Sequence, residues 1–261
     1  MSTFTEKDLQ SFTSRGVTEE AIARQIGHFR RGFPFAELVR PATPGDGIEV
    51  LDNKGADALI RYYDEHSGPV KTIKFVPASG AASRMFKALF EYLEQAKNTN
   101  QAELIERDKG FDSPWNFIRN MDKFAFYDDL REAMKTNGLD IEQEISGGRY
   151  DAVIDALVNA PGLDYGNLPK GLLKFHSYGH QSRVAMEEHL VEAALYAASA
   201  SGTANVHFTV SPEHLEKFRD KVADVKPGYE KEFGITIDVS FSVQKPSTDT
   251  IAVDMDNNPF R

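Results

Sequence analysis

The clearest pattern of apolar and polar positions lies close to the C-terminal end of the chain. Apolar and polar residues alternate from Ile235 to Val243, and this period of two predicts a β-strand with one buried face. Short apolar runs at Lys71–Val76 and Asn205–Val210 predict two further strands, and Leu172–Phe175 is a fourth short apolar run. We expect Lys71–Val76, Asn205–Val210 and Ile235–Val243 to lie side by side in one sheet.

Helical spacing separates these strands. The stretches Glu187–Ala200 and Glu213–Val222 repeat apolar residues with the period of a helix and lie on either side of the strand at 205–210. Strands that alternate with helices predict an α/β fold with a mostly parallel sheet flanked by helices.

Two further regions read as helical. Thr5 and Thr18 each precede a helical stretch, so residues 1–30 are predicted to form a helical hairpin, followed by an irregular, proline-containing segment. Residues 98–166 are mostly helical in pattern, with Ser113 and Pro114 as a helix start. We therefore expect an N-terminal segment over 1–67 and an α/β domain over 68–261, which carries a helical insertion at about 98–166.

Composition narrows the classes of function. The 261 residues are 41% hydrophobic and 27% charged, which is typical of a folded globular protein. The absence of cysteine excludes disulfides and cysteine-ligated metals and agrees with a cytoplasmic protein, and we see no signal peptide or membrane span. The net charge of −10 disfavours nucleic-acid binding but permits a small anion in a local basic pocket.

The strongest candidate site is a loop of small residues between the first strand and a helix. After Val76 the chain runs through Pro77 to Ser83, and from Arg84 the apolar positions take helical spacing. Small residues let backbone N–H groups approach a phosphate, and a following helix adds partial positive charge. The candidate phosphate-binding residues are Ala78, Ser79, Gly80, Ala81, Ala82 and Ser83. A tight turn that only lets the helix pack on the sheet is the alternative, because neither the Rossmann nor the Walker pattern is matched.

Two cations accompany this loop. Arg84 follows it directly, where a guanidinium can bind a phosphate through two hydrogen bonds. Lys170 lies in a turn restrained by Pro169 and Gly171, ahead of an apolar run. Solvated surface roles are the alternative for both side chains.

These motifs resemble those of the sugar nucleotidyltransferases, which have a glycosyltransferase-A-like fold. The likeness rests on Val76–Arg84, on Pro169–Leu172, on Glu188–Leu190 and on Phe241–Pro246. Within this superfamily the chain is most similar to the family of the domain of unknown function 4301. The resemblance implies a nucleotide-diphospho-sugar-transferase-like fold in which the loop, Arg84 and Lys170 grip a triphosphate.

The same resemblance implies substrates and a cofactor. A nucleoside triphosphate and a sugar phosphate would be the substrates, Mg²⁺ the cofactor, and Gln244 a contact to the base. The resembled enzymes continue with a metal-binding strand and a sugar-binding half, so the resemblance also implies that this chain is a truncated domain. A non-catalytic nucleotide-binding or protein-interaction module is the alternative function.

Candidate metal ligands are few. Asp254 and Asp256 follow an apolar run, as in Asp-X-Asp sites for magnesium or manganese, although the same residues also suit a plain turn. The histidines at 176, 180 and 189 match no zinc motif, and hydrogen bonding in the core or at the surface is the expected role for them.

Overall fold

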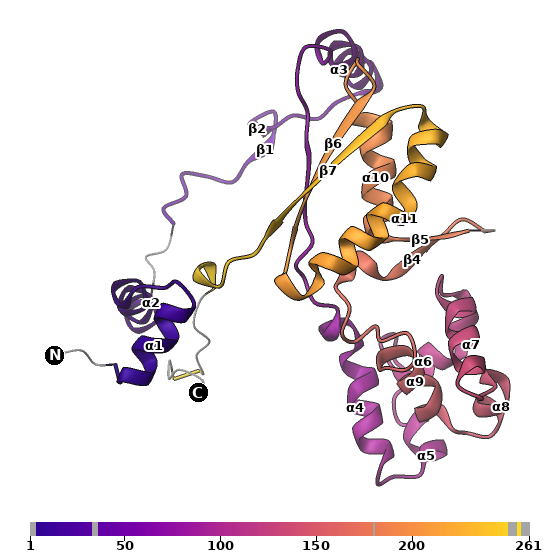
Figure 1. Ribbon diagram of the computed structural model, residues 1–261. Coiled ribbons are helices and arrows are strands. Elements are labelled where there is room, and N and C mark those ends of the chain that lie inside the picture. Colours follow the sequence, from indigo (N-terminus) through magenta and orange to yellow (C-terminus); the bar gives the residue numbers. More distant parts are fainter. Residues whose placement is uncertain (1–3, 33–35, 180, 250–254, 257–261) are drawn as a thin grey trace. The chain divides into compact units, whose positions relative to one another are not determined.

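The computed structural model describes residues 4–32, 36–179, 181–249 and 255–256 (Figure 1). Contacts between residues divide the chain into two units. One unit comprises Met1–His66 together with Gln244–Arg261, and the other comprises Ser67–Val243. Residues 244–261, predicted to be part of the α/β domain, are instead grouped by these contacts with the N-terminal segment.

The first unit begins with the two helices that the pattern predicts. Thr5 caps α1 by accepting a hydrogen bond from the Asp8 N–H, and Thr18 caps α2 through the Ala21 N–H. These caps satisfy N–H groups that the first turn of a helix leaves unpaired. The elements of this unit are α1 (Glu6–Ser14), α2 (Glu19–Arg31), the short strands β1 (Thr43–Pro44) and β2 (Gly47–Ile48), and α3 (Asn53–His66).

The second unit is built on a parallel sheet. Its strands are β3 (Lys74–Pro77), β6 (Thr203–Val210) and β7 (Thr236–Val243), in the order β3, β6, β7. All pairs are parallel, with Val76 opposite Phe208 and Phe208 opposite Phe241. The α/β class and the three predicted strands are thereby confirmed.

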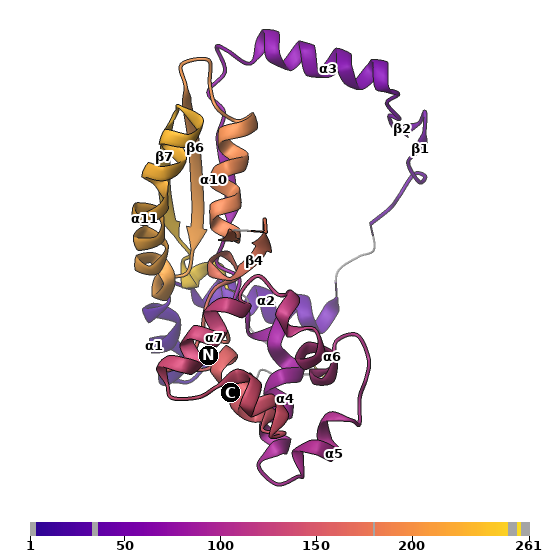
Figure 2. The ribbon, with the colours of Figure 1, turned by 90° about the vertical axis from the view of Figure 1, so that its right-hand side faces the viewer.

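Two helices cover one face of this sheet: α10 (Ala185–Tyr196) and α11 (Leu215–Phe233) (Figures 1 and 2). Alternate residues of β6 point into this layer and are fully buried, as the period of two requires. The core between sheet and helices also includes Met186, Leu190, Phe218 and Ile237. Burial of this apolar surface is the main stabilising term for the layer.

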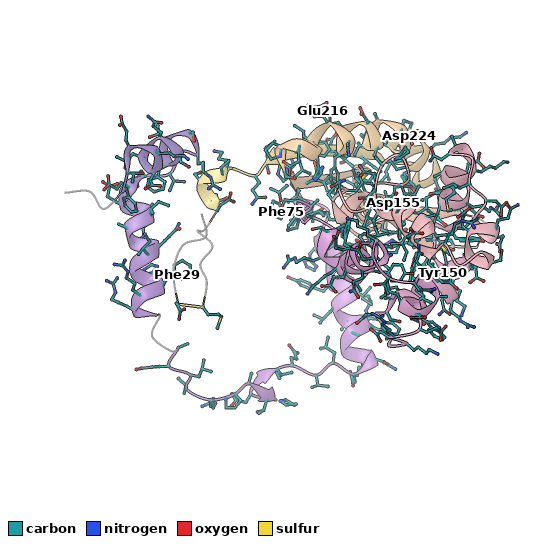
Figure 3. All side chains as sticks on the ribbon, turned by 90° about the horizontal axis from the view of Figure 1, so that it is seen from below. Phe29, Phe75, Tyr150, Asp155, Glu216 and Asp224 are labelled. Carbon is teal, nitrogen blue, oxygen red and sulfur yellow. The ribbon has the colours of Figure 1, made fainter. Side chains whose placement is uncertain are left out.

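The opposite face of the sheet is polar apart from one ring. Phe75 is 60% exposed and stacks on His207 with 5.5 Å between ring centroids (Figure 3). His207 makes hydrogen bonds of 2.8 and 2.9 Å with Ser240 and Ser242 on the neighbouring strand. The alternation predicted for 235–243 therefore separates a buried face from this polar one.

Helix α11 is longer than its predicted core of 213–222. It continues across Pro227 to Phe233 and ends at Gly234, which has the left-handed conformation that favours glycine (φ 66°). Proline removes one helical hydrogen bond, but Tyr229 beyond it is buried against α10 and holds the last turns. None of the helices in the described ranges is long and apolar enough to span a membrane.

A buried polar contact joins the two helices of the layer. The Tyr229 hydroxyl donates a hydrogen bond of 2.7 Å to Glu187, and Lys221 pairs with the same carboxylate at 3.0 Å. Burial, followed by the bond to Glu187, raises the pKa of the Tyr229 hydroxyl. A buried carboxylate needs such partners, so Glu187 fixes α10 against α11.

A helical region leaves the sheet after β3 and returns before β4. It has its own apolar core, which includes Phe86, Leu130, Ile154 and Leu157. Ser113 caps the helix that begins at Pro114, as predicted, and this helix is short and ends at Arg119. Its helices are α4 (Lys87–Ala96), α5 (Gln101–Ile105), α6 (Pro114–Arg119), α7 (Tyr127–Thr136), α8 (Ile141–Ser146) and α9 (Tyr150–Val158).

The chain re-enters the sheet layer through a short hairpin. Strands β4 (Lys174–Ser177) and β5 (Ser182–Val184) pair with each other in antiparallel fashion. The apolar run Leu172–Phe175 therefore leads into a separate two-stranded sheet.

Candidate functional site

The small-residue loop lies at the carboxyl edge of the parallel sheet. Strand β3 ends at Pro77, and the Ala78 N–H extends its pairing with β6 by donating to the Thr209 carbonyl at 2.7 Å. In open α/β sheets this edge is where ligands bind. The loop then enters a short 3-10 turn, η1 (Ser83–Phe86), which leads into α4.

Several N–H groups of the loop have no partner. Across the described residues, no hydrogen bond is formed by the N–H of Ser79, Gly80 or Ala81. Gly80 and Ala81 are exposed and Ser79 is half-buried, so a ligand can reach these groups. Consecutive unpaired N–H groups favour an anion.

The Pro-Lys turn is paired directly with this loop. The Lys170 N–H donates to the Gly80 carbonyl at 3.0 Å, and the Ala82 N–H donates to the Leu168 carbonyl at 3.2 Å. These two bonds hold the start and the end of the helical region side by side, although the two lie far apart in the sequence. Lys170 is exposed, and its ammonium forms no ion pair with any described residue. The structure therefore places the backbone of Lys170 directly against the loop, and both Lys170 and Gly80 line one cavity.

Gly171 has a steric role in this turn. A Cβ atom at this position would lie 2.7 Å from Cζ of Phe218, which is fully buried on α11. Only glycine lets the turn approach the core this closely. At Gly80, by contrast, a Cβ atom would meet no atom within 4 Å.

A cavity of about 160 Å³ adjoins the loop and the turn. Its polar side chains are Lys170 and His189, and Met186, Phe208 and Phe218 form much of its apolar wall. His189 lies on α10, and its Nδ1 is 3.1 Å from a carboxylate oxygen of Glu192. Because a carboxylate only accepts, Nδ1 donates to Glu192, and no described residue forms a hydrogen bond with Nε2.

A chain of polar contacts holds His189 in this orientation. Lys74 on β3 pairs with Glu192 at 2.6 Å and with the Tyr196 hydroxyl at 2.6 Å. The bond from Lys74, followed by that from His189, lowers the pKa of the Glu192 carboxyl. Partial burial opposes the charge of Lys74, but the bonds to Glu192 and Tyr196 outweigh it and raise the pKa of the ammonium. His189 was not predicted as a site residue from the sequence. The signal that could have pointed to it is Glu192, an acidic residue three positions later on the same helix.

Arg84 belongs to a different cavity. It lies in η1, is exposed, and lines a larger cavity that also contains several phenylalanine rings. Arg84 does not line the cavity beside the loop. Ala78 and Ala82 are buried and bonded to neighbouring backbone, so Ser79, Gly80 and Ala81 are the accessible part of the predicted set, with Ser83 exposed at the start of η1.

The remaining predicted residues fall in or beside the last segment of the chain. Gln244 directly follows β7 but groups with the first unit, where its side chain donates to Asp249 at 3.5 Å. Asp254 lies outside the described residues, and Asp256 is exposed. Within the described ranges no cluster of three or more histidines and carboxylates is arranged to hold a metal ion.

Comparison with protein-family models identifies the family of this chain. The model of the domain of unknown function DUF4301 matches residues 5–261. The chain belongs to the DUF4301 family. This confirms the family that its motifs resemble, and the match covers both units. Neither the curated proteins nor the solved structures provide a match to this DUF4301 chain.

The steric role of Gly171 predicts a selective loss of stability. We expect Gly171→Ala to lower the free energy of unfolding by about 1–3 kcal/mol, because the added methyl group overpacks the core at Phe218. Gly80→Ala is the matched control and should change stability by less than about 0.5 kcal/mol, since its methyl group meets open space. Urea unfolding of the two variants measures both values. Equal stability of the two variants would show that the turn can move away from α11.

The Glu192 contacts predict a pH-dependent contribution to stability. A carboxyl whose pKa is lowered by folding stabilises the protein above its unfolded pKa, and this contribution disappears as the pH falls. We expect Glu192→Gln to lose about 0.5–1 kcal/mol at pH 7, a small value because the side chain is 41% exposed. The difference from the unsubstituted chain should be clearly smaller at about pH 3.5, below the usual carboxyl pKa, because the contribution is lost as the pH falls through the lowered folded pKa.

Urea unfolding at the two pH values tests this, with Glu132→Gln as the control. Glu132 is exposed on α7, so its substitution should leave stability nearly unchanged at both pH values. A Glu192→Gln deficit that stayed constant with pH would mean that shape, and not charge, matters at this position.

Proposed function

We propose that this chain binds a nucleoside triphosphate at the loop Ser79–Ala81. The observation that carries the proposal is the backbone pairing of the loop with the Pro-Lys turn, which brings Lys170 to a loop with unpaired N–H groups at the carboxyl edge of a parallel sheet. Phosphate groups are ligands for such a combination of backbone N–H groups and a lysine. The likeness of the same two motifs to those of sugar nucleotidyltransferases supports the choice of a triphosphate.

The size of the cavity suggests which part of the nucleotide enters it. The cavity of about 160 Å³ is smaller than the roughly 300–1,000 Å³ typical of small-molecule sites. This cavity suits a phosphate group, which Lys170 and Nε2 of His189 would contact. The nucleoside would lie outside the cavity. Lys170 contributes a fixed charge, while His189 donates a hydrogen bond when its ring is protonated.

The finer proposal is nucleotidyl transfer. A phosphate oxygen of a sugar phosphate would attack the α-phosphorus, forming one P–O bond while the bond to the β-phosphate breaks and pyrophosphate leaves. Lys170 and the loop N–H groups would stabilise the negative charge that develops. Mg²⁺ would enter with the triphosphate, because this ion is commonly bound through substrate phosphates and a few carboxylates. It would neutralise charge on the phosphate oxygens.

Nucleotide binding is tested by thermal unfolding with ATP, GTP, CTP, UTP and dTTP, each with Mg²⁺. A nucleotide present at 100 times its Kd stabilises the folded chain by about 2.7 kcal/mol, which is roughly 5–10 °C at this size. We expect at least one nucleotide to raise the Tm, and Lys170→Ala to weaken its binding by roughly 10- to 100-fold, the value of a charge-assisted hydrogen bond.

Lys135→Ala is the matched control, since Lys135 is exposed on α7 and lines neither cavity. Absence of any shift with all five nucleotides at millimolar concentration would overturn the proposal. Release of pyrophosphate with a panel of sugar phosphates then separates the enzyme from a non-catalytic nucleotide-binding module, the second candidate. Binding without release would favour the module.

A further inference from the structure

The helical region holds a second, larger cavity. Its volume is about 630 Å³, within the range of small-molecule sites. The turn η1 and helix α4 form one wall, and residues near α6 and β4 form the other. The apolar side chains that line it are Met85, Phe86, Leu89, Phe111, Phe117, Phe124, Phe126 and Phe175.

The rings of this cavity are held by one another. Phe124 stacks on Phe126 with 5.1 Å between centroids, and Phe126 meets Phe175 edge to face at 6.4 Å. Phe117 contacts Phe124 at 5.6 Å. Mutual packing of this kind fixes ring orientations, so the wall is preformed.

Several of these rings remain open to a ligand. Phe111 is 89% exposed, Phe124 is 40% exposed and Phe175 is 36% exposed. Large apolar side chains gathered around a hollow mark a binding surface more often than isolated exposed ones do. Flat apolar molecules are the ligands that such faces accommodate.

The charged side chains that line the cavity indicate the charge of the ligand. Lys87 pairs with Glu91 at 3.6 Å, so these two charges offset each other. Asp112 also lines the cavity, is exposed, and lies one residue before Ser113, the N-cap of α6. Arg84 forms no side-chain hydrogen bond or ion pair with a described residue, so its guanidinium can bind an anionic group.

We propose that this cavity, named here the aromatic cavity, binds a small molecule with a flat apolar body and one anionic group. The rings would contact the body, and Arg84 would bind the anionic group. The inference does not rest on nucleotide binding, because no residue of the loop Ser79–Ala81 lines the aromatic cavity.

Two fluorescent probes test the inference. The anionic probe 8-anilinonaphthalene-1-sulfonate has the same rings as the neutral N-phenyl-1-naphthylamine. We expect both to bind the whole chain at one saturable site, the anionic probe about tenfold more tightly, as expected for one charge-assisted contact. Equal affinities, or weaker binding of the anionic probe, would overturn the role of Arg84.

Variants assign the binding to the aromatic cavity. Arg84→Gln should abolish the difference between the probes, whereas Arg107→Gln, at an exposed arginine outside the cavity, should preserve it. Phe124→Ala should weaken both probes at least tenfold, whereas Phe75→Ala, at an exposed ring on the sheet, should not. Thermal unfolding confirms that each variant is folded.

A measurement on the unsubstituted chain tests the inference even if a variant fails to fold. The methyl resonance of Met85, which lines the aromatic cavity, should shift on addition of the anionic probe. The methyl resonance of Met186, which lines the small cavity beside the loop, should remain in place. A shift of Met186 alone, or probe binding at many weak sites, would show that the aromatic cavity is not a small-molecule site and is open to another occupant, such as an apolar protein segment.

Discussion

Two backbone hydrogen bonds determine the arrangement of the second unit. They join the loop at Gly80 and Ala82 to the turn at Leu168 and Lys170, and thereby close the helical region at its base. They act together with the close contact of Gly171 with Phe218 and with Leu173, which is buried in the core of the helical region. Because backbone groups make these bonds, they depend on the path of the chain more than on any one side chain.

The helical region closed by these two bonds has one cavity on each side of the loop. On the sheet side, Lys170 and His189 face a small cavity next to unpaired N–H groups. On the helical side, Arg84 faces the larger aromatic cavity. The two cations that the sequence associates with one phosphate site are thus divided between two cavities. A single ligand touching both would have to reach around the turn η1.

Much of the α/β layer could be predicted from the sequence. Alternation over 235–243 predicted β7, since burial of one face of a strand requires that period. Thr5, Thr18 and Ser113 were correctly placed at helix starts, because capping is a local interaction. The helix after β6 was predicted too short, since tertiary burial of Tyr229 carries it past Pro227.

Less of the candidate sites could be predicted from the sequence. The loop and Lys170 could be predicted as site candidates because small residues and a restrained lysine are visible in the local sequence. His189 could not, since its orientation depends on Glu192 and on Lys74 from a distant strand. The aromatic cavity was also missed, because its rings come from positions 86 to 175 and are brought together only by the closed helical region.

The central claim is that the loop beside the Pro-Lys turn binds phosphate through its backbone. Backbone amide resonances measured while a nucleoside triphosphate is added with Mg²⁺ test this directly. The account predicts that the N–H resonances of Ser79, Gly80 and Ala81 shift most, together with those of Lys170 and His189, while that of Phe111 at the edge of the aromatic cavity remains in place. Saturable shifts confined to other parts of the chain, with Ser79–Ala81 unchanged, would contradict it.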